Sequence, residues 1–283
     1  MPRAACKVSS KLMVRIVGRT HPGARGGQNQ DSIGWDESRQ LAFVADGMGG
    51  YASGEVASGL VKQTLLDTAG TVKLVDAVMS AHAKIRAAAA ERTEYAGMGS
   101  TIVALHIVDR TGTVVWVGDS RAYLWRRGSL QPLTRDHSVI EILRDVENLS
   151  ETAIRSHPLR HKIVQSLGND TPEPAVADTP LRTGDWLLLC SDGLSSELRD
   201  SQIADELRAH PSLKGSADAL INGALANGGR DNISVVLVEY TGRSKIMPGG
   251  RWSEKTTLWL SILGGILLAV MVTGVGLWFR HRL

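Results

Sequence analysis

The chain has 283 residues, 43% of them apolar, and a formal charge of +3, which excludes a protein disordered throughout and favours a globular one. The positive charge lies at one end, because residues 243–283 hold six Lys or Arg and one acid, which leaves 26 bases against 28 acids in residues 1–242. Residues 1–242 also lack a basic stripe with interleaved aromatic residues, so their composition is not that of a nucleic-acid-binding protein.

The N-terminal segment and the cysteine content indicate a cytosolic domain. Arg3 and Lys7 come early, but no continuous apolar stretch follows them, so we expect no secretory signal. The two cysteines, Cys6 and Cys190, are too few for a disulfide framework or a zinc cluster. A reducing compartment fits this content best.

Short apolar runs and amphipathic stretches predict an α+β fold. Apolar residues recur at helical spacing in two stretches, one beginning near Ser53 and one that includes residues 75–85. A tight turn is expected at residues 109–112, as in an antiparallel hairpin, so we expect antiparallel sheets covered by helices. The predicted strands are residues 41–45, 101–108, 113–117, 122–125, 186–190 and 233–239.

A transmembrane helix is predicted at residues 256–279. These 24 residues carry no charge, and a helix needs roughly 20 such residues to cross a bilayer. Trp259 and Trp278 lie near the two ends, where indole rings favour the interface. A buried core helix is the alternative, although the segment has no polar face.

The charges around this segment favour a single-pass protein of the cell membrane whose N-terminal domain faces the cytoplasm, because Lys and Arg are more numerous before the segment than after it. The predicted organisation is a domain at 1–242, a basic juxtamembrane linker at 243–255, the transmembrane helix at 256–279 and a short basic tail at 280–283.

Four aspartates stand beside apolar runs. Asp46 and Asp192 each follow a run and precede a glycine, Asp231 precedes a run, and Asp119 follows residues 113–117. A single Asp-Gly pair is most often only a turn. Together, the four indicate carboxylates that converge at one rim of a sheet, where they repel one another unless a cation neutralises them. Oxygen ligands favour Mg²⁺ or Mn²⁺ over zinc, which predicts a two-metal hydrolytic site.

Eight short motifs follow one another through almost all of the first 240 residues. They are GARGGQNQDS (23–32), DGMGG (46–50), GMGST (97–101), GDSRAY (118–123), LTRDHS (133–138), HPLRHKIVQSLG (157–168), SDGL (191–194) and GRDNISV (229–235). In this order they resemble the type 2C metal-dependent protein serine/threonine phosphatases in their bacterial form. The resemblance implies an αββα fold, in which two antiparallel sheets pack face to face with pairs of helices outside.

The same resemblance implies the reaction and its metal ligands. Asp46 would bridge two Mn²⁺ or Mg²⁺ ions, with the Gly47 carbonyl on one ion. Asp192 and Asp231 would be ligands of the other ion. A water held between the ions would then attack the phosphorus of phosphoserine or phosphothreonine, with no phosphoenzyme.

Further roles follow from the resemblance. Asp31 would orient metal-bound water, and Asp119 would help to bind a third, weaker ion. Asn232 either fixes the turn that aims Asp231 or is a plain turn residue. The expected partners are phosphorylated proteins, the targets of a serine/threonine kinase.

Three positions depart from the family pattern. The family usually has a phosphate-binding Arg five residues before Asp31; Gly26 stands there, so Arg25 is the candidate. Gln30 replaces the usual Glu, which removes a negative charge from the predicted metal site. Tyr51 stands where many relatives have His, so the proton donor to the leaving group stays open, with a metal-bound water as one choice.

Two other functions compete with the phosphatase. A catalytically weakened, membrane-tethered phosphoprotein-binding module is favoured by the three departures and disfavoured by the intact aspartates. A two-metal nuclease would share the metal chemistry, but the near-neutral domain argues against it. Residues 133–168 are expected to form a flap beside the site, and we interpret its His137 and His157 as structural groups.

Overall fold

The structure is a computed structural model that describes residues 13–49, 53–147, 150, 153–154, 157–159, 161–169 and 171–242. The chain divides into two units, Met1–Arg243 and Ser244–Leu283. The predicted linker, transmembrane helix and tail all lie outside the described residues, as does Tyr51. Among the residues that are described, no helix is long and apolar enough to span a membrane.

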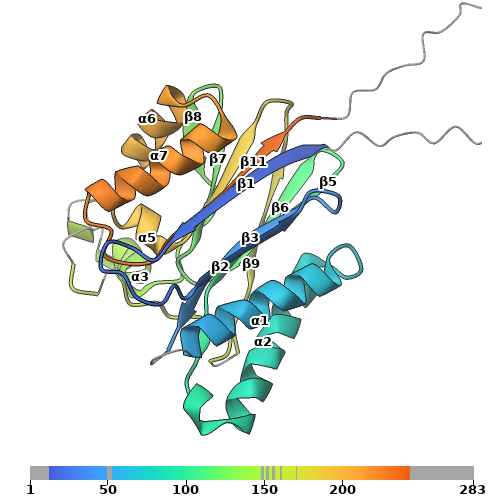
Figure 1. Cartoon of the computed structure of the whole chain (residues 1–283), viewed down its shortest axis with the longest axis vertical. Coiled ribbons are helices and arrows are strands. Elements are labelled where there is room, and N and C mark those ends of the chain that lie inside the picture. The colour runs from blue at the N-terminus through green and yellow to red at the C-terminus, as the bar shows by residue number, and fades with distance from the viewer. Residues whose placement is uncertain are drawn as a thin grey trace, which may run out of the picture. The chain divides into compact units, whose positions relative to one another are not determined.

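The first of two antiparallel sheets has the order β1-β11-β10-β7-β8 (Figure 1). Strand β11 pairs with β1 on one side and with β10 on the other. The strands are β1 (Val14–His21), β7 (Arg121–Arg126), β8 (Ser129–Pro132), β10 (Trp186–Cys190) and β11 (Ile233–Tyr240).

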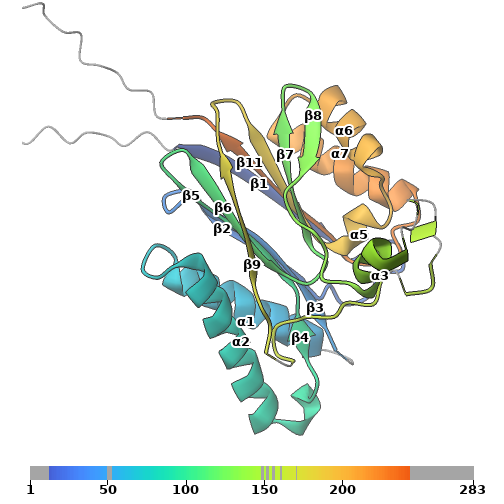
Figure 2. The same cartoon turned by 180° about the vertical axis from the view of Figure 1, so that it is seen from behind.

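The second sheet has the order β2-β3-β5-β6-β9, with β4 pairing to the end of β3. Its strands are β2 (Asp31–Asp36), β3 (Leu41–Met48), β4 (Gly99–Ser100), β5 (Ile102–Val108), β6 (Thr111–Val117) and β9 (Ala175–Pro180). The two sheets pack face to face, as both views show (Figures 1 and 2).

Alternating side chains on each strand build three apolar layers. Val236 and Val238 of β11 point into the layer between the sheets, whereas Val235 and Leu237 point to the outer layer. A strand buried on both faces reads as a continuous apolar run, which is why residues 233–239 were recognisable in the sequence. The layer between the sheets therefore fixes the distance of one sheet from the other.

Helices cover both outer faces. The helices α1 (Ser53–Thr68) and α2 (Leu74–Glu91) pack on the second sheet, while α6 (Asp200–Ala209) and α7 (Leu213–Ala226) pack on the first (Figures 1 and 2). Three short helices complete the described elements: η1 (Thr93–Tyr95), α3 (Val139–Glu147) and α5 (Asp192–Ser195). The predicted α+β fold with two antiparallel sheets and flanking helices is confirmed.

The predicted strands lie where the apolar runs indicated, but several elements were not predicted. The hairpin of β5 and β6 turns at Asp109, whose φ is 54°, and β6 begins two residues earlier than expected. The edge strands β1, β2, β8 and β9 were missed. Few of their side chains are buried, so their sequences contain no continuous apolar run. Helices α6 and α7 were also missed; in α6 only Ile203 and Leu207 of the ten residues are buried.

Antiparallel pairing places the aspartate-bearing strand ends together. Asp31 at the start of β2 lies opposite Asp46 near the end of β3. The opposite end of the sandwich holds both ends of the described domain, because Val14 pairs with Tyr240 and the Thr241 N–H donates to the Met13 carbonyl at 2.8 Å. The aspartate rim therefore lies far from residues 13 and 242.

Candidate metal centre

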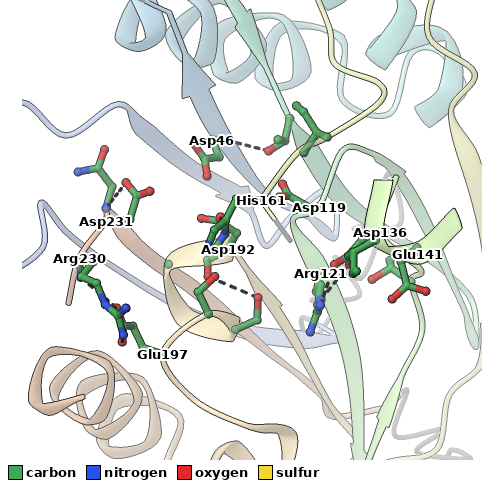
Figure 3. Close-up of a pocket in the computed structure, with 18 of the residues that line it drawn as sticks. Asp46, Asp119, Arg121, Asp136, Glu141, His161, Asp192, Glu197, Arg230 and Asp231 are labelled. Atoms are coloured by element: carbon green, nitrogen blue, oxygen red, sulfur yellow. Dashed lines mark hydrogen bonds and ion pairs between the residues drawn. The ribbon is translucent and has the colours of Figure 1, made fainter. Parts of the chain in front are cut away.

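The predicted aspartates meet at the rim of a pocket of about 1180 Å³. Asp46, Asp119, Asp192 and Asp231 line it, and Figure 3 shows them extending from strand and helix ends into a common space. Asp31 is 92% buried beside Asp46, so it lies behind the pocket wall. The strand ends and the segments next to them thus bring together all five aspartates singled out in the sequence.

Backbone contacts hold Asp46 in a fixed position at the end of β3. Its N–H donates to Thr101 Oγ1 at 3.1 Å, and its carbonyl accepts from the Thr101 N–H at 2.8 Å. Thr101 Oγ1 in turn lies 2.7 Å from the Oγ of Ser120, the residue after Asp119. One threonine therefore links the strand end that bears Asp46 to the turn that bears Asp119.

Two glycines allow the backbone to close around the site. A Cβ on Gly47 would lie 2.0 Å from the Gly54 carbonyl oxygen, at the start of α1. A Cβ on Gly193 would lie 2.0 Å from the Asn232 carbonyl oxygen. Both Asp-Gly pairs therefore have a packing reason beyond turn formation, because any larger residue would push the carboxylate-bearing segments apart.

Asn232 joins the loop before β2 to the loop before β11. Its Oδ1 accepts from the Gln30 N–H at 2.8 Å, and its Nδ2 donates to the Pro22 carbonyl at 3.1 Å. Its own N–H donates to Asp231 Oδ1 at 2.7 Å. These contacts give Asn232 the aiming role that was one of its two sequence interpretations.

Burial and mutual repulsion act on the carboxylates. Burial raises the pKa of Asp46 well above its ordinary value, and the charges of Asp31 and Asp192 raise it further. Burial likewise raises the pKa of Asp119, with Asp192 again adding to the shift. Burial and then Asp192 also raise the pKa of Asp231. The site holds more negative charge than its surroundings stabilise.

The two carboxylate oxygens of the buried Asp31 differ in their contacts. Its Oδ2 accepts from Ser191 Oγ at 2.8 Å, while its buried Oδ1 has no hydrogen-bond partner among the described residues. Burial raises the pKa of Asp31 to about 7, although hydrogen bonds from Ser234 and Ser191 oppose that shift. A buried carboxylate oxygen without a partner is costly unless water or an ion satisfies it.

These residues fit divalent cations with a preference for oxygen. No described Lys or Arg forms an ion pair with Asp46 or Asp119, although the charge of Arg121 partly offsets the rise in the pKa of Asp119. Across the described segments, no three Asp, Glu, His or Cys side chains stand close enough to hold one ion unaided. That spacing is expected of carboxylates that repel one another without a cation. The all-oxygen donor set suits Mg²⁺ or Mn²⁺.

The structure also places the remaining predicted residues. Arg25 is exposed on the pocket wall, makes no hydrogen bond or ion pair with any described residue, and lowers the pKa of Asp231 by its charge. Gln30 also lines the pocket. The flap histidines have local partners: His137 Nδ1 accepts from the Gly118 N–H at 3.4 Å, and His157 Nδ1 accepts from the Leu159 N–H at 3.1 Å.

Sequence reasoning missed several charged residues in the pocket. His161 Nδ1 lies 3.7 Å from Asp192 Oδ2, and Arg230 pairs with Glu197 beside Asp231 (Figure 3). Arg121 pairs with Asp136 at 2.7 Å across the base of the flap. His161 and Arg230 lie within the recognised motifs, but motif membership alone does not show which side chains meet.

Comparison with known proteins decides the family. The family model for protein phosphatase 2C matches residues 17–232, which is more than half of the chain. The chain belongs to the protein phosphatase 2C family. The geometry of the rim, the fold and the order of the motifs all agree with this assignment.

Individual relatives agree with it. The chain is 37% identical over 235 residues to the serine/threonine protein phosphatase PstP of Mycobacterium tuberculosis, covering 81% of this chain but 45% of PstP. It is 35% identical over 237 residues to the serine/threonine phosphatase stp of Listeria welshimeri, covering 78% of this chain and 94% of stp. The chain thus spans less than half the length of one relative and nearly all of the other.

One similar solved structure contains metal ions. The catalytic domain of serine/threonine protein phosphatase PstP in complex with two manganese ions superposes with a TM-score of 0.73 at 33% identity. The match covers 80% of this chain and 97% of that one. Two manganese ions in this relative agree with the all-oxygen rim of the present chain.

Stability of the metal-free chain should fall as the pH rises from about 5 to 8. The folded pKa of Asp31, about 7, lies above the 3.8 of a free carboxyl, so the folded state keeps a proton that the unfolded state releases. Urea unfolding in a chelator measures this slope. Asp31→Asn should make it shallower by at most about 1.4 kcal/mol per pH unit. Identical slopes for the two proteins would contradict the assigned burial.

Asp46→Asn should stabilise the metal-free chain and remove its stabilisation by Mn²⁺. The substitution takes one charge out of a buried, mutually repelling set, and also removes the predicted bridging ligand. Thermal unfolding at pH 8, with chelator and then with Mn²⁺, measures both effects. Asp67→Asn, at an exposed position on α1, is the control and should resemble the parent. A Mn²⁺-dependent rise in Tm that survives in Asp46→Asn would argue against the site.

Proposed function

We propose that the chain hydrolyses phosphoserine and phosphothreonine on proteins, with Mn²⁺ or Mg²⁺ as cofactor, and so reverses the action of a serine/threonine kinase. The observation that carries the proposal is the set of five mutually repelling aspartates at one pocket, of which Asp31 and Asp119 are buried, in a chain of the protein phosphatase 2C family. The names of the relatives and the two manganese ions of one of them support the reaction and the metal.

Asp46, the Gly47 carbonyl, Asp192 and Asp231 would hold two ions, and Asp119 would contribute to a third. Such ions lower the pKa of water to generate a nucleophile, and they neutralise phosphate oxygens. The protein keeps its carboxylates aimed at the pocket through Thr101, Asn232 and the two glycines described above.

Arg25 is the residue best placed to bind the substrate phosphate. It is exposed on the pocket wall, it has no described partner that would have to be displaced, and its charge already acts on Asp231. Its position one residue before the usual family position is compatible with this role, because Gly26 and Gly27 both have positive φ and space around Cα. A flexible pair of glycines lets the neighbouring Arg approach the site.

Turnover of a phosphothreonine peptide by the full chain in detergent should require Mn²⁺ or Mg²⁺ and should stop after chelation. Asp46→Asn and Asp192→Asn should each lower kcat by at least about a thousandfold while the fold is retained, since each removes a metal ligand. Asp185→Asn is a control at the far end of the sandwich and should retain activity, as Asp185 pairs with Arg126 there.

Two outcomes would contradict the proposal. A folded, Mn²⁺-binding chain that binds the phosphopeptide without turnover would favour the binding module, and metal-dependent cleavage of DNA without phosphopeptide hydrolysis would favour the nuclease. The binding module is otherwise not favoured, because Asp46, Asp192 and Asp231 are all present and share one pocket.

We further propose that residues 256–279 anchor the chain in the cell membrane with the catalytic domain in the cytoplasm. The uncharged length of this segment and its basic N-terminal flank support the proposal. Residue 242, after which the expected linker begins, lies at the end of the domain opposite the aspartate rim. An anchor attached there would leave the pocket open to substrates.

The full chain should float with liposomes in a density gradient, and a chain that ends at Gly242 should stay in the soluble fraction. Reporter fusions after Leu283 test the orientation: alkaline phosphatase should be active and a cytoplasmic fluorescent protein dark. Equal flotation of both chains would argue against the anchor, and the opposite reporter pattern would argue against the orientation.

A further inference from the structure

The loop between α7 and β11 carries Asp231 but has little regular structure to fix it. Residues 227–232 include Gly228 and Gly229, both with positive φ. The first half of the loop is held to α7, because the Gly229 N–H donates to the Ala224 carbonyl at 3.0 Å. The second half, which bears Asp231, needs contacts from elsewhere.

Glu197 supplies those contacts from the segment that carries Asp192. It follows the short helix α5 by two residues, and its side chain is 4% exposed. The Arg230 N–H donates to Glu197 Oε1 at 3.1 Å, and the Arg230 guanidinium donates to Oε1 at 3.1 Å and to Oε2 at 3.2 Å. One buried carboxylate thus holds both the backbone and the side chain of the residue before Asp231.

The two segments that this pair joins are those of Asp192 and Asp231. We propose that Glu197 and Arg230 are positioning residues that set the separation of Asp192 from Asp231, and thereby the metal affinity of the site. The inference rests on the proposed function, in which these aspartates are ligands of the same ion. Ion pairs in which a guanidinium makes two hydrogen bonds to one carboxylate hold a fixed geometry, because the planar guanidinium matches the carboxylate.

The direction of the Arg230 side chain supports a positioning role over contact with substrate. Its guanidinium lies against Glu197, on the side away from Asp46 (Figure 3). Gly228 also packs beside this carboxylate, since a Cβ there would lie 3.1 Å from Glu197 Oε2. The backbone from Gly228 to the Arg230 N–H is therefore shaped around Glu197.

The chain contains a matched control at the other end of the same sheet. Asp185 is also 4% exposed, and it accepts from Arg126 Nε at 2.9 Å, from Arg126 Nη2 at 2.6 Å and from the Arg182 N–H at 2.6 Å. It has the same three kinds of donor as Glu197 but lies beside the far end of β10. Any general cost of removing the charge of a buried, paired carboxylate appears in both variants.

The test measures Mn²⁺ affinity of the metal-stripped full chain in detergent by calorimetry. Glu197→Gln keeps the side-chain size but loses the charge, and should raise the Kd for Mn²⁺ about tenfold, at the low end of the effect of residues that orient metal ligands. Arg230→Lys should act in the same direction, because an ammonium does not form the paired contact. The double variant should bind no more weakly than the weaker single one. Asp185→Asn should bind Mn²⁺ as the parent does.

Steady-state kinetics add a readout that a loss of stability alone would not give. In Glu197→Gln, the Mn²⁺ concentration for half-maximal activity should rise with the Kd, and saturating Mn²⁺ should restore kcat to within about threefold. Unchanged Mn²⁺ affinity in Glu197→Gln would overturn the inference. So would a raised KM for the phosphopeptide with parental Mn²⁺ affinity in Arg230→Lys, which would make Arg230 a substrate contact. A parent chain that binds no Mn²⁺ would instead overturn the proposed function, and this inference with it.

Discussion

The repulsion among buried aspartates is the constraint on which the rest of the structure depends. Asp31 and Asp46 face each other across neighbouring strands, and burial raises the pKa of both. A fold that only had to be stable would place apolar or hydrogen-bonded residues there. The rim therefore stores an unfavourable interaction that a divalent cation relieves, and rigid neighbours such as Thr101 and Asn232 prevent the carboxylates from turning away into water.

The carboxylates come from both sheets, so the apolar layer between the sheets affects the geometry of the metal site. Asp31 and Asp46 belong to the second sheet, whereas Asp192 and Asp231 adjoin β10 and β11 of the first. Their separation across the pocket is set by how closely the two sheets pack, and interiors packed at crystal-like density transmit small changes in volume. Residues far from the rim, in the layer that includes Val236 and Val238, thus help to determine the metal site.

The sequence was most informative where one physical requirement dominates a segment. Runs 186–190 and 233–239 are buried on both faces, and their apolar content alone located β10 and β11. The aspartates were recognisable because they stand at the ends of such runs. The edge strands and α6 were not recognisable, because they carry fewer buried apolar residues. The Glu197–Arg230 pair was not, because contacts between residues 33 positions apart depend on the path of the whole chain. The sequence explained the Asp-Gly pairs only as turns. The close approach of Gly54 to Gly47 and of Asn232 to Gly193 appears only in three dimensions.

The two ends of the described domain lie side by side, where β1 and β11 pair and residue 241 bonds to residue 13. Chain ends that adjoin each other at a surface are where insertion into another protein and circular permutation are tolerated. The described domain can therefore be joined to other segments at either end, or inserted into a loop of a host domain, without a change to any residue of the rim. New combinations of domains can therefore arise by recombination at one small area of the fold.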